Sequence, residues 1–254
     1  MTIDDRIAAR RARVREDRRR ARLRRTIWAL VLLGVLAALV LVERSSLVAL
    51  AEVQVRGTER LQAEEVRAAS GLELGTSTLR LALDDAAEEI ERELPLVERA
   101  EARRLDPLTV ELLVVERTPV LVAEGQGTRR YLDREGVVID EVAAEEGPSL
   151  PVIELPAPPP AVGGHAAEDA ALDNAVAAWR GLSGSLRAEV RRYQAAGPDE
   201  LTLTLGSGVD VRLGRAVRMD EKVRALGAVL ADVGDTPVAL IDVRAPSAPV
   251  VVAP

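Results

Sequence analysis

The sequence predicts an α+β protein in which a single transmembrane helix precedes two folded units. Three observations lead to this prediction. Residues 27–42 form an uncharged apolar run, residues 52–119 show the order β-α-α-β-β, and residues 120–246 combine alternating strands with flanking helical segments. Strands that alternate apolar and polar side chains favour sheets with one buried face, so we expect the second unit to be a mostly antiparallel β domain.

The apolar run reads IWALVLLGVLAALVLV and contains eleven Leu, Ile or Val residues. Such residues favour insertion by roughly 0.3 to 0.6 kcal/mol each, hence by about 3 to 7 kcal/mol together. A helix of this length rises about 24 Å against about 30 Å of hydrocarbon, so Arg24 and Arg25 must snorkel or the bilayer must thin. A buried core helix is the alternative interpretation. The expected anchor residues are Ile27, Trp28, Leu30, Leu33, Leu36, Leu39 and Val42.

The charge distribution predicts the topology. Residues 1–26 hold eleven Arg against four acidic residues, a net charge of +7, whereas the whole chain carries −7. Arginine-rich segments beside a span stay in the cytoplasm. We therefore expect a basic cytoplasmic arm (1–26), the helix (27–42), a juxtamembrane connector (43–51) and extracytoplasmic C-terminal units. This is the single-pass type II arrangement of a cell-membrane protein.

The N-terminal region is also compatible with a signal peptide or a nucleic-acid-binding arm. Ala49-Leu50-Ala51 has the A-x-A form of a signal-peptide cleavage site, although it lies seven residues beyond Val42 and the basic arm is longer than a usual n-region. The arm could also bind nucleic acid. Because it has no aromatic residue and adjoins the span, contact with anionic lipid is the simpler interpretation, and we expect no nucleic-acid partner.

The composition excludes several kinds of site. The chain has no Cys, which excludes disulfides, thiol nucleophiles and Cys-ligated metals. Phe is absent and Trp and Tyr number two each, so Leu, Val, Ile and Ala must build the cores. His165 is the single histidine, and no nucleophile is predicted beside it. Asp133 and Asp140 bracket a predicted hairpin, where turn formation explains Asp133 better than acid–base chemistry. We therefore predict no enzymatic activity, cofactor, metal or small-molecule substrate.

The first unit is predicted to begin with a strand at 53–57 and a short helix at 62–69. A second helix starts near Asp85, which stands in capping-box spacing with Glu88. Residues 97–104 and 109–117 then flank a turn at 105–108 and form a hairpin. This order places two helices on one face of a three-stranded sheet.

The second unit is predicted from local patterns along residues 120–246. A hairpin spans 130–133 and 137–140, a strand follows at 150–153, and a helix begins near Ala166. Leu201, Leu203 and Leu205 alternate with Thr and lead through a glycine turn into a strand at 209–213. A helix with apolar residues at 219, 223, 226 and 230 precedes the closing strand, 239–244. Residues 247–254 are expected to be a C-terminal tail.

A series of short motifs resembles a known family. The motifs are Val55-x-Gly57, Leu94-Pro95-x-Val97, Ala100, Arg104-x-x-Pro107, Glu116-Arg117-x-Pro119, Tyr131-Leu-Asp133-x-x-Gly136, Leu150-Pro151-Val152-Ile153, Val211-x-Leu213-Gly214, Glu221-Lys222 and Ala239–Arg244. This series, directly after a type II anchor, resembles the bacterial cell-division family FtsQ, also called DivIB. The resemblance implies a POTRA domain at 52–119 and an FtsQ-type β domain at 120–246.

The family resemblance implies a function and a partner. It implies a non-enzymatic, membrane-anchored divisome scaffold that recruits other division proteins during septum formation and is enriched at the septum. Members of this family receive FtsB, itself paired with FtsL, at the edge of their last strand, which is β-strand addition. Other division proteins are expected at the POTRA domain. The positions implied for partner binding are Ile241, Val243, Arg244, Ala245, Ser247 and Ala248.

Two functions of other classes remain as alternatives. Cleavage after Ala51 would release a secreted, POTRA-bearing binding or hydrolytic protein. A membrane-anchored sensor that signals through its basic arm is the third candidate, although the arm has no apolar periodicity.

Overall fold

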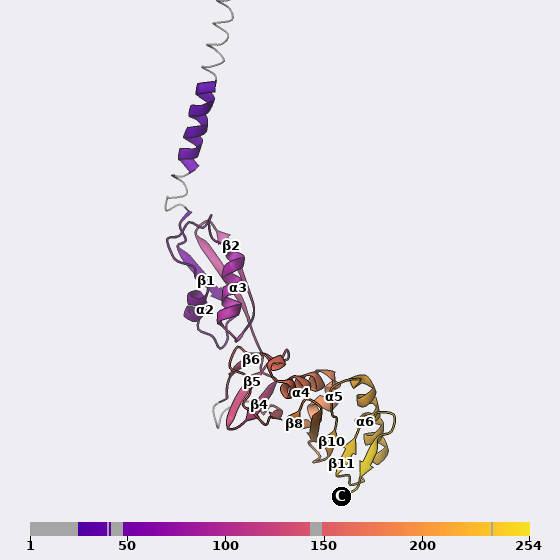
Figure 1. The fold of residues 1–254 in the computed structure, drawn as a ribbon. Helices are drawn as coiled ribbons and strands as arrows, with labels where there is room; N and C mark the ends of the chain where they lie inside the picture. The colour runs from indigo at the N-terminus through magenta and orange to yellow at the C-terminus, as the bar shows by residue number, and fades with distance from the viewer. Residues whose placement is uncertain (1–24, 40, 42–47, 143–148, 235) are drawn as a thin grey trace, which may run out of the picture.

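The computed structural model describes residues 25–39, 41, 48–142, 149–234 and 236–254 (Figure 1). The expected anchor residue Val42, most of the basic arm and residues 43–47 of the connector lie outside this described part. The described chain contains an N-terminal helix and two separate sheets, each with its own hydrophobic core. This mixed α+β arrangement confirms the predicted class of the two C-terminal units.

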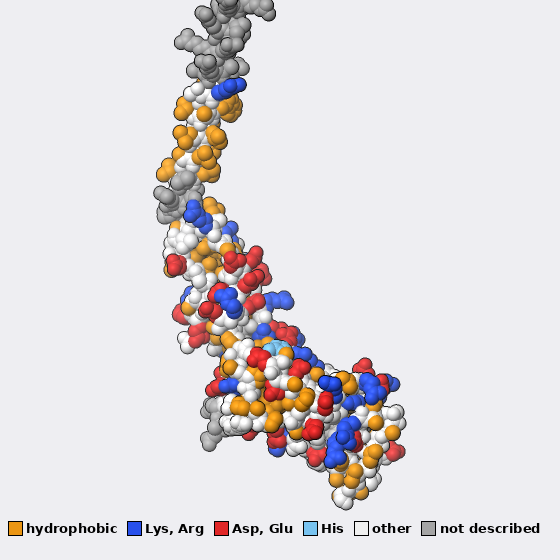
Figure 2. Space-filling model, viewed as in Figure 1, with side chains coloured by type: hydrophobic (Ala, Val, Ile, Leu, Met, Phe, Trp, Pro, Cys, Tyr) orange, Lys and Arg blue, Asp and Glu red, His pale blue; other side chains and the backbone are white. Residues whose placement is uncertain are grey.

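The N-terminal helix covers residues 25–39, with residue 41 also helical, and its apolar side chains are exposed. Trp28 is 72% exposed and Leu30 is 62% exposed. Figure 2 shows apolar side chains around this helix. Within the described residues, no helix has both the length and the hydropathy needed to cross a membrane.

The first sheet has three strands in the order β1-β3-β2. They are β1 (Glu52–Arg56), β2 (Val97–Asp106) and β3 (Thr109–Glu116), and β1 pairs parallel with the central strand β3. Helices α2 (Ala63–Ala69) and α3 (Leu83–Glu93) supply Val66 and Ile90 to the core, both fully buried. The predicted β-α-α-β-β order is therefore confirmed.

The predicted start of the second helix of this unit is wrong. Helix α3 begins at Leu83, its N-cap is Ala82, and no side chain caps it. Asp84 and Asp85 both lie in the first turn instead, where carboxylates interact favourably with the positive end of the helix dipole. Leu83 packs against the first core, so apolar burial rather than a capping box sets the start of this helix.

The second sheet has nine strands in the order β12-β11-β10-β9-β8-β7-β4-β5-β6. Five of its eight neighbouring pairs are antiparallel and three are parallel. The strands are β4 (Leu121–Gly125), β5 (Thr128–Leu132), β6 (Val138–Glu141), β7 (Val152–Glu154), β8 (Val190–Gly197), β9 (Glu200–Leu205), β10 (Asp210–Arg212), β11 (Leu240–Asp242) and β12 (Val250–Val252).

One face of the second sheet is apolar and lies under helices. Helices α4 (Ala170–Gly181), α5 (Gly184–Glu189) and α6 (Met219–Val233) pack on this face (Figure 1). Register places one residue from each of six neighbouring strands in a row across it, and each is fully buried. The row is Ile241, Val211, Leu203, Tyr193, Ile153 and Ala123.

The opposite face of the same six strands is polar. A second row lies beside the first and contains one neighbour of each buried residue. Its side chains point to the other face, because side chains alternate between the two faces of a strand. The row is Asp242, Arg212, Thr202, Gln194, Glu154 and Glu124. The sheet is therefore one-sided, with a buried apolar face and a polar face.

The Glu116-Arg117 dipeptide joins the two units. The Glu116 carboxylate accepts the backbone N–H groups of Glu59, Arg60 and Leu61 at 2.8 to 3.0 Å, which fixes the turn before α2. The Arg117 guanidinium reaches the other way and donates to the buried carboxylate of Asp133 at 2.5 Å. Neighbouring residues of one motif thus hold a turn in the first unit and a turn in the second.

We predict that Glu116→Gln destabilises the first unit by about 1–2 kcal/mol at neutral pH, because a neutral amide replaces a carboxylate at three backbone donors. Burial acts to raise the pKa of Glu116, but the N–H groups of Leu61, Glu59 and Arg60 outweigh it and lower the pKa. A lowered native pKa stabilises the fold above the unfolded value, and this stabilisation is lost as pH falls through the native value.

The difference between Glu116→Gln and the parent protein should therefore shrink at acid pH. Urea titrations at pH 7 and pH 3 measure it. An equal difference at both pH values would contradict the assigned role of the carboxylate. Glu88→Gln, on the exposed side of α3, serves as the control and should change stability little at either pH.

Candidate partner-binding edge

The expected edge strand is not at the edge of the sheet. Strand β11 (Leu240–Asp242) pairs parallel with β10 on one side and antiparallel with β12 on the other. The chain turns back after Arg244, and Val250 to Val252 occupy the side of β11 that the sequence predicts to be free. Three consecutive β-branched residues favour this extended pairing. The prediction that 239–244 is the last strand and forms the edge is therefore wrong.

Two of the six implied partner-binding residues lie in the core. Ile241 and Val243 are both fully buried, and the backbone N–H of Val243 donates to the carbonyl of Arg212 at 3.0 Å. Neither side chain is available to a partner on the outside of the sheet. Their apolar side chains pack in the core, so the implied direct contact of Ile241 and Val243 with a partner is wrong.

The other four implied residues are exposed together in the turn between β11 and β12. Arg244, Ala245, Ser247 and Ala248 are all exposed, and the N–H of Ala248 donates to the carbonyl of Ala245 at 3.0 Å to close the turn. We call β12 and residues 244–249 the C-terminal edge. The valines of β12 are 56%, 42% and 44% exposed in chain order.

Arg244 is held in place by Asp242. The Arg244 Nε donates to both carboxylate oxygens of Asp242 at 3.1 and 3.0 Å, and a terminal guanidinium nitrogen donates at 2.7 Å. The hydrogen bond from Arg244 outweighs the opposing effect of burial and holds the pKa of the Asp242 carboxyl below its usual value. The arginine stem crosses Gly214, where a Cβ would lie 3.1 Å from the Arg244 Cγ. Gly214 also has φ +67°, a backbone conformation that favours glycine, so a side chain here would be strained as well as tight against Arg244.

A buried polar clamp under the C-terminal edge is a feature that the sequence patterns do not predict. Asn174 on α4 donates to the Gly214 carbonyl at 3.1 Å and accepts the N–H of Ala216 at 2.7 Å. Lys222 on α6 donates to the carbonyls of Leu213 and Arg215, both at 2.7 Å. Two helices therefore fix the loop on which Arg244 rests. The only feature of the sequence that indicates this clamp is Lys222, which is the single lysine of the chain and belongs to the Glu221-Lys222 motif.

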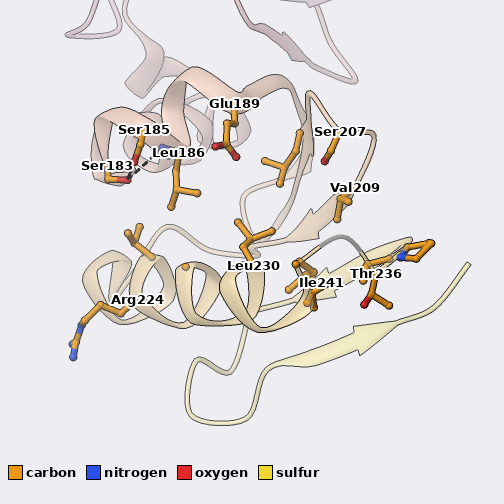
Figure 3. A pocket seen from close by; sticks show the side chains of 17 residues that line it. Ser183, Ser185, Leu186, Glu189, Ser207, Val209, Arg224, Leu230, Thr236 and Ile241 are labelled. Atoms are coloured by element: carbon orange, nitrogen blue, oxygen red, sulfur yellow. Dashed lines mark hydrogen bonds between the residues drawn. The ribbon is translucent and has the colours of Figure 1, made fainter.

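A groove opens on the helix side of this end of the sheet (Figure 3). Its volume is about 870 Å³, and it lies between α5, α6, the β9–β10 turn and β11. Leu186 and Leu230 point into it from the two helices, and Val209 lines it from the β9–β10 turn. Its charged lining residues are Glu189 and Arg224. The lining is thus mainly apolar, with serine hydroxyls at its rim.

The polar residues weighed as catalytic have structural roles. The His165 Nδ1 accepts the N–H of Ala167 at 3.0 Å, so this side chain caps the short 3₁₀ helix Ala166–Glu168. Asp133 accepts the N–H groups of Glu135 and Val137 at 2.8 Å, as predicted for a turn residue. Within the described residues, no three His, Asp or Glu side chains are grouped so as to hold a metal ion.

Comparisons with known protein families and proteins agree with one another. The family model for the FtsQ-type POTRA domain matches residues 48–117, and that for the C-terminal region of cell division protein FtsQ/DivIB matches 120–244. Cell division protein FtsQ of Streptomyces collinus is 30% identical over 236 residues, which cover 89% of this chain and 88% of that protein.

Mycobacterial relatives are longer than this chain. The FtsQ protein of Mycobacterium leprae is 31% identical over 199 residues, 78% of this chain but 54% of that protein. That of Mycolicibacterium smegmatis is 32% identical over 200 residues, 78% of this chain and 56% of that protein. The chain thus spans about half the length of these two relatives. The extracytoplasmic domain of DivIB from Geobacillus stearothermophilus aligns with 48% of this chain and 97% of its own, at 12% identity and a TM-score of 0.33, too weak a likeness to support a conclusion.

We predict that Lys222→Met lowers the free energy of unfolding by about 2–4 kcal/mol, because it leaves two largely buried carbonyls without their donor. The methionine keeps the length of the side chain, so the cost reflects lost hydrogen bonds more than lost packing. Chemical denaturation measures it. Arg224→Met, on the same helix, is the matched control, because the Arg224 Nε donates to a carbonyl of its own helix, that of Asp220. This control should change stability by less than about 0.5 kcal/mol, and equal losses in both variants would refute the clamp.

Proposed function

The chain belongs to the FtsQ/DivIB family of cell-division proteins, and we propose that it is a non-enzymatic scaffold of the divisome. In this proposal the chain is anchored in the cell membrane and presents its C-terminal edge to an FtsB-type partner that is paired with an FtsL-type protein. Residues 52–119 would act as the POTRA domain and residues 120–246 as the β domain. The first of these would also contact other division proteins at the septum.

The observation that carries the proposal is the free outer side of β12. An edge strand presents unpaired N–H and C=O groups that can accept a strand from another chain. This edge is flanked by the exposed turn that carries Arg244, and the clamp of Asn174 and Lys222 supports that turn from below. A rigid edge loses less conformational entropy on binding than a mobile tail. These features favour strand addition outside β12 rather than beside β11.

The opposite edge of the sheet is a weaker candidate. Strand β6 ends with the charged residues Asp140 and Glu141, and Glu141 is engaged by Arg130 at 3.1 Å. Charged side chains on an edge strand discourage pairing with other chains. Strand β12 consists of three valines and has no charged side chain that would discourage pairing. This difference favours the C-terminal edge.

Membrane anchorage rests on the N-terminal helix and its flanks. The apolar side chains of residues 27–39 are exposed, which is costly in water. Eleven arginines precede them. A type II anchor explains both features. A signal peptide would also combine basic and apolar segments, but this arm is longer than a usual n-region and Ala49-Leu50-Ala51 lies seven residues beyond Val42. Ala51 also donates its N–H to the carbonyl of Leu108 at 2.8 Å, so the proposed cleavage site is part of the first folded unit.

We predict that proline at an outward-pointing N–H of β12 reduces capture of the extracytoplasmic segment of an FtsB-type protein by at least about tenfold, the equivalent of about 1.4 kcal/mol. Single substitutions Val250→Pro, Val251→Pro and Val252→Pro scan the strand, since successive N–H groups point to opposite sides. The parent fold should persist where the replaced N–H points outward, because the valine side chains are exposed. Proline at an N–H that points toward β11 removes a ladder hydrogen bond, so the folding of each variant is checked by circular dichroism. Binding is measured by pull-down and by calorimetry.

Further variants accompany this scan, one in β6 at the opposite edge of the sheet and one at Arg244, next to β12. Asp140→Pro in β6 should leave capture unchanged, whereas Arg244→Glu should weaken it, because it reverses the charge of the exposed turn and replaces the ion pair with Asp242 by two like charges. Arg92→Glu, on α3 of the first unit, is the charge-reversal control. The substitution Val243→Pro is unsuitable, since it would remove a hydrogen bond inside the sheet. If every folded proline variant of β12 captures the partner normally, the binding surface lies elsewhere.

We also predict that the anchor is not cleaved. Intact-mass measurement of protein extracted from membranes should show the arginine-rich arm still attached. A soluble product that begins at Glu52 would contradict the anchor and favour the secreted alternative.

A further inference from the structure

One end of the first unit carries three exposed leucines. Leu74 is 66% exposed, Leu79 is 62% exposed and Leu105 is 45% exposed. The first two lie in the loop between α2 and α3, and the third lies near the end of β2, beside the turn to β3. Single exposed apolar residues are common, but three on two adjoining loops require an explanation.

The loop between α2 and α3 is bound to the start of the unit. The N–H of Thr78 donates to the carbonyl of Val48 at 2.7 Å, and the N–H of Gly75 donates to the carbonyl of Leu50 at 2.8 Å. Leu74 and Leu79 are the residues next to these two anchoring positions. Both leucines therefore lie beside the point at which the chain enters the first unit.

The β2–β3 turn is bound to the same place. The Thr78 hydroxyl donates to the carbonyl of Pro107 at 2.7 Å, and the Arg104 guanidinium donates to the carbonyl of Thr78. The N–H of Ala51 donates to the carbonyl of Leu108 at 2.8 Å. Leu105 thus stands on the same end of the unit as the other two leucines.

The chain length keeps this end close to the N-terminal helix. Only residues 42–47 separate Leu41 from Val48. A fully extended chain gains about 3.3–3.6 Å per residue, so the two positions are at most about 25 Å apart. If the helix is embedded in a bilayer, the leucine-bearing end is the part of the first unit that faces the lipid headgroups.

We propose that Leu74, Leu79 and Leu105 form a membrane-contact surface that inserts into the headgroup region of the bilayer. This inference rests on the proposed membrane anchor and extends it. The contact would hold the first unit against the membrane and limit its rotation about the connector. Lipid is the occupant because the short connector brings this end to the bilayer whatever other protein is present. The exposed Arg104 beside Leu105 is compatible with an anionic surface, whereas Arg103 is paired with Glu111.

Site-specific fluorescence tests the contact in the full chain, which has no native cysteine to interfere. Leu79→Cys, labelled with an environment-sensitive dye, is reconstituted in vesicles of phosphatidylglycerol and phosphatidylcholine. We expect a blue shift of the emission and quenching by nitroxide-bearing lipid. Val115→Cys is the matched control, because Val115 is 53% exposed near the other end of β3 and should give neither signal. Leu74→Cys provides a second reporter if the first variant does not fold.

The outcomes separate the two proposals. Labelled protein that floats with the vesicles while Leu79 and Leu74 remain unquenched would overturn the contact and leave the anchor intact. Protein that does not float would overturn the anchor and the contact together. Equal quenching at Val115 would show non-specific adhesion and overturn the contact. A dye at position 79 that responds only when another division protein is added would do the same, because the occupant would then be that protein.

Discussion

The second unit depends on a row of buried side chains that crosses six strands. Every member of the row is fully buried, and each comes from a strand whose next residue faces the polar side. A one-residue shift in any strand would bring a charged or polar residue such as Arg212 or Gln194 under the helices. The register is therefore set jointly by six strands that lie up to about 120 residues apart in the chain, from Ala123 to Ile241. Such non-local agreement explains how short strands of three residues are held in place.

The elements that local patterns predict are those whose own residues alternate or repeat. Leu201, Leu203 and Leu205 face the core because each is separated by one Thr, and the structure places them on β9 with little exposure. Strand β12 has no such pattern, since three consecutive valines after Pro249 look the same on both faces. Its position depends on pairing with β11, which a sequence window does not contain. The start of α3 differs from its prediction for a related reason, because burial of Leu83 outweighs the local capping signal.

The candidate site is predictable from the sequence only in its outward-facing part. Arg244 and the turn after it are identified by the family resemblance, and their exposure agrees with a surface role. Val243 is buried because it belongs, like Ile241, to the second hydrophobic core, and its N–H pairs with Arg212 rather than with β12. The clamp of Asn174 and Lys222 is also beyond local patterns, because Asn174 bonds to a loop 40 residues away. Polar residues inside helices acquire such roles through tertiary contacts rather than through spacing.

The one-sided construction of the sheet extends to its last strand and therefore to any strand that joins it. Val251 is paired with Ile241 and lies on the apolar side, the side of the groove between α5 and α6. Val250 is paired with Asp242 and lies on the side of the polar row. A strand that joins β12 as proposed would continue this alternation, with successive side chains on the apolar and on the polar side of the sheet. In the proposed complex, a segment shifted by one residue would place its polar side chains on the apolar side of the sheet and its apolar ones on the polar side.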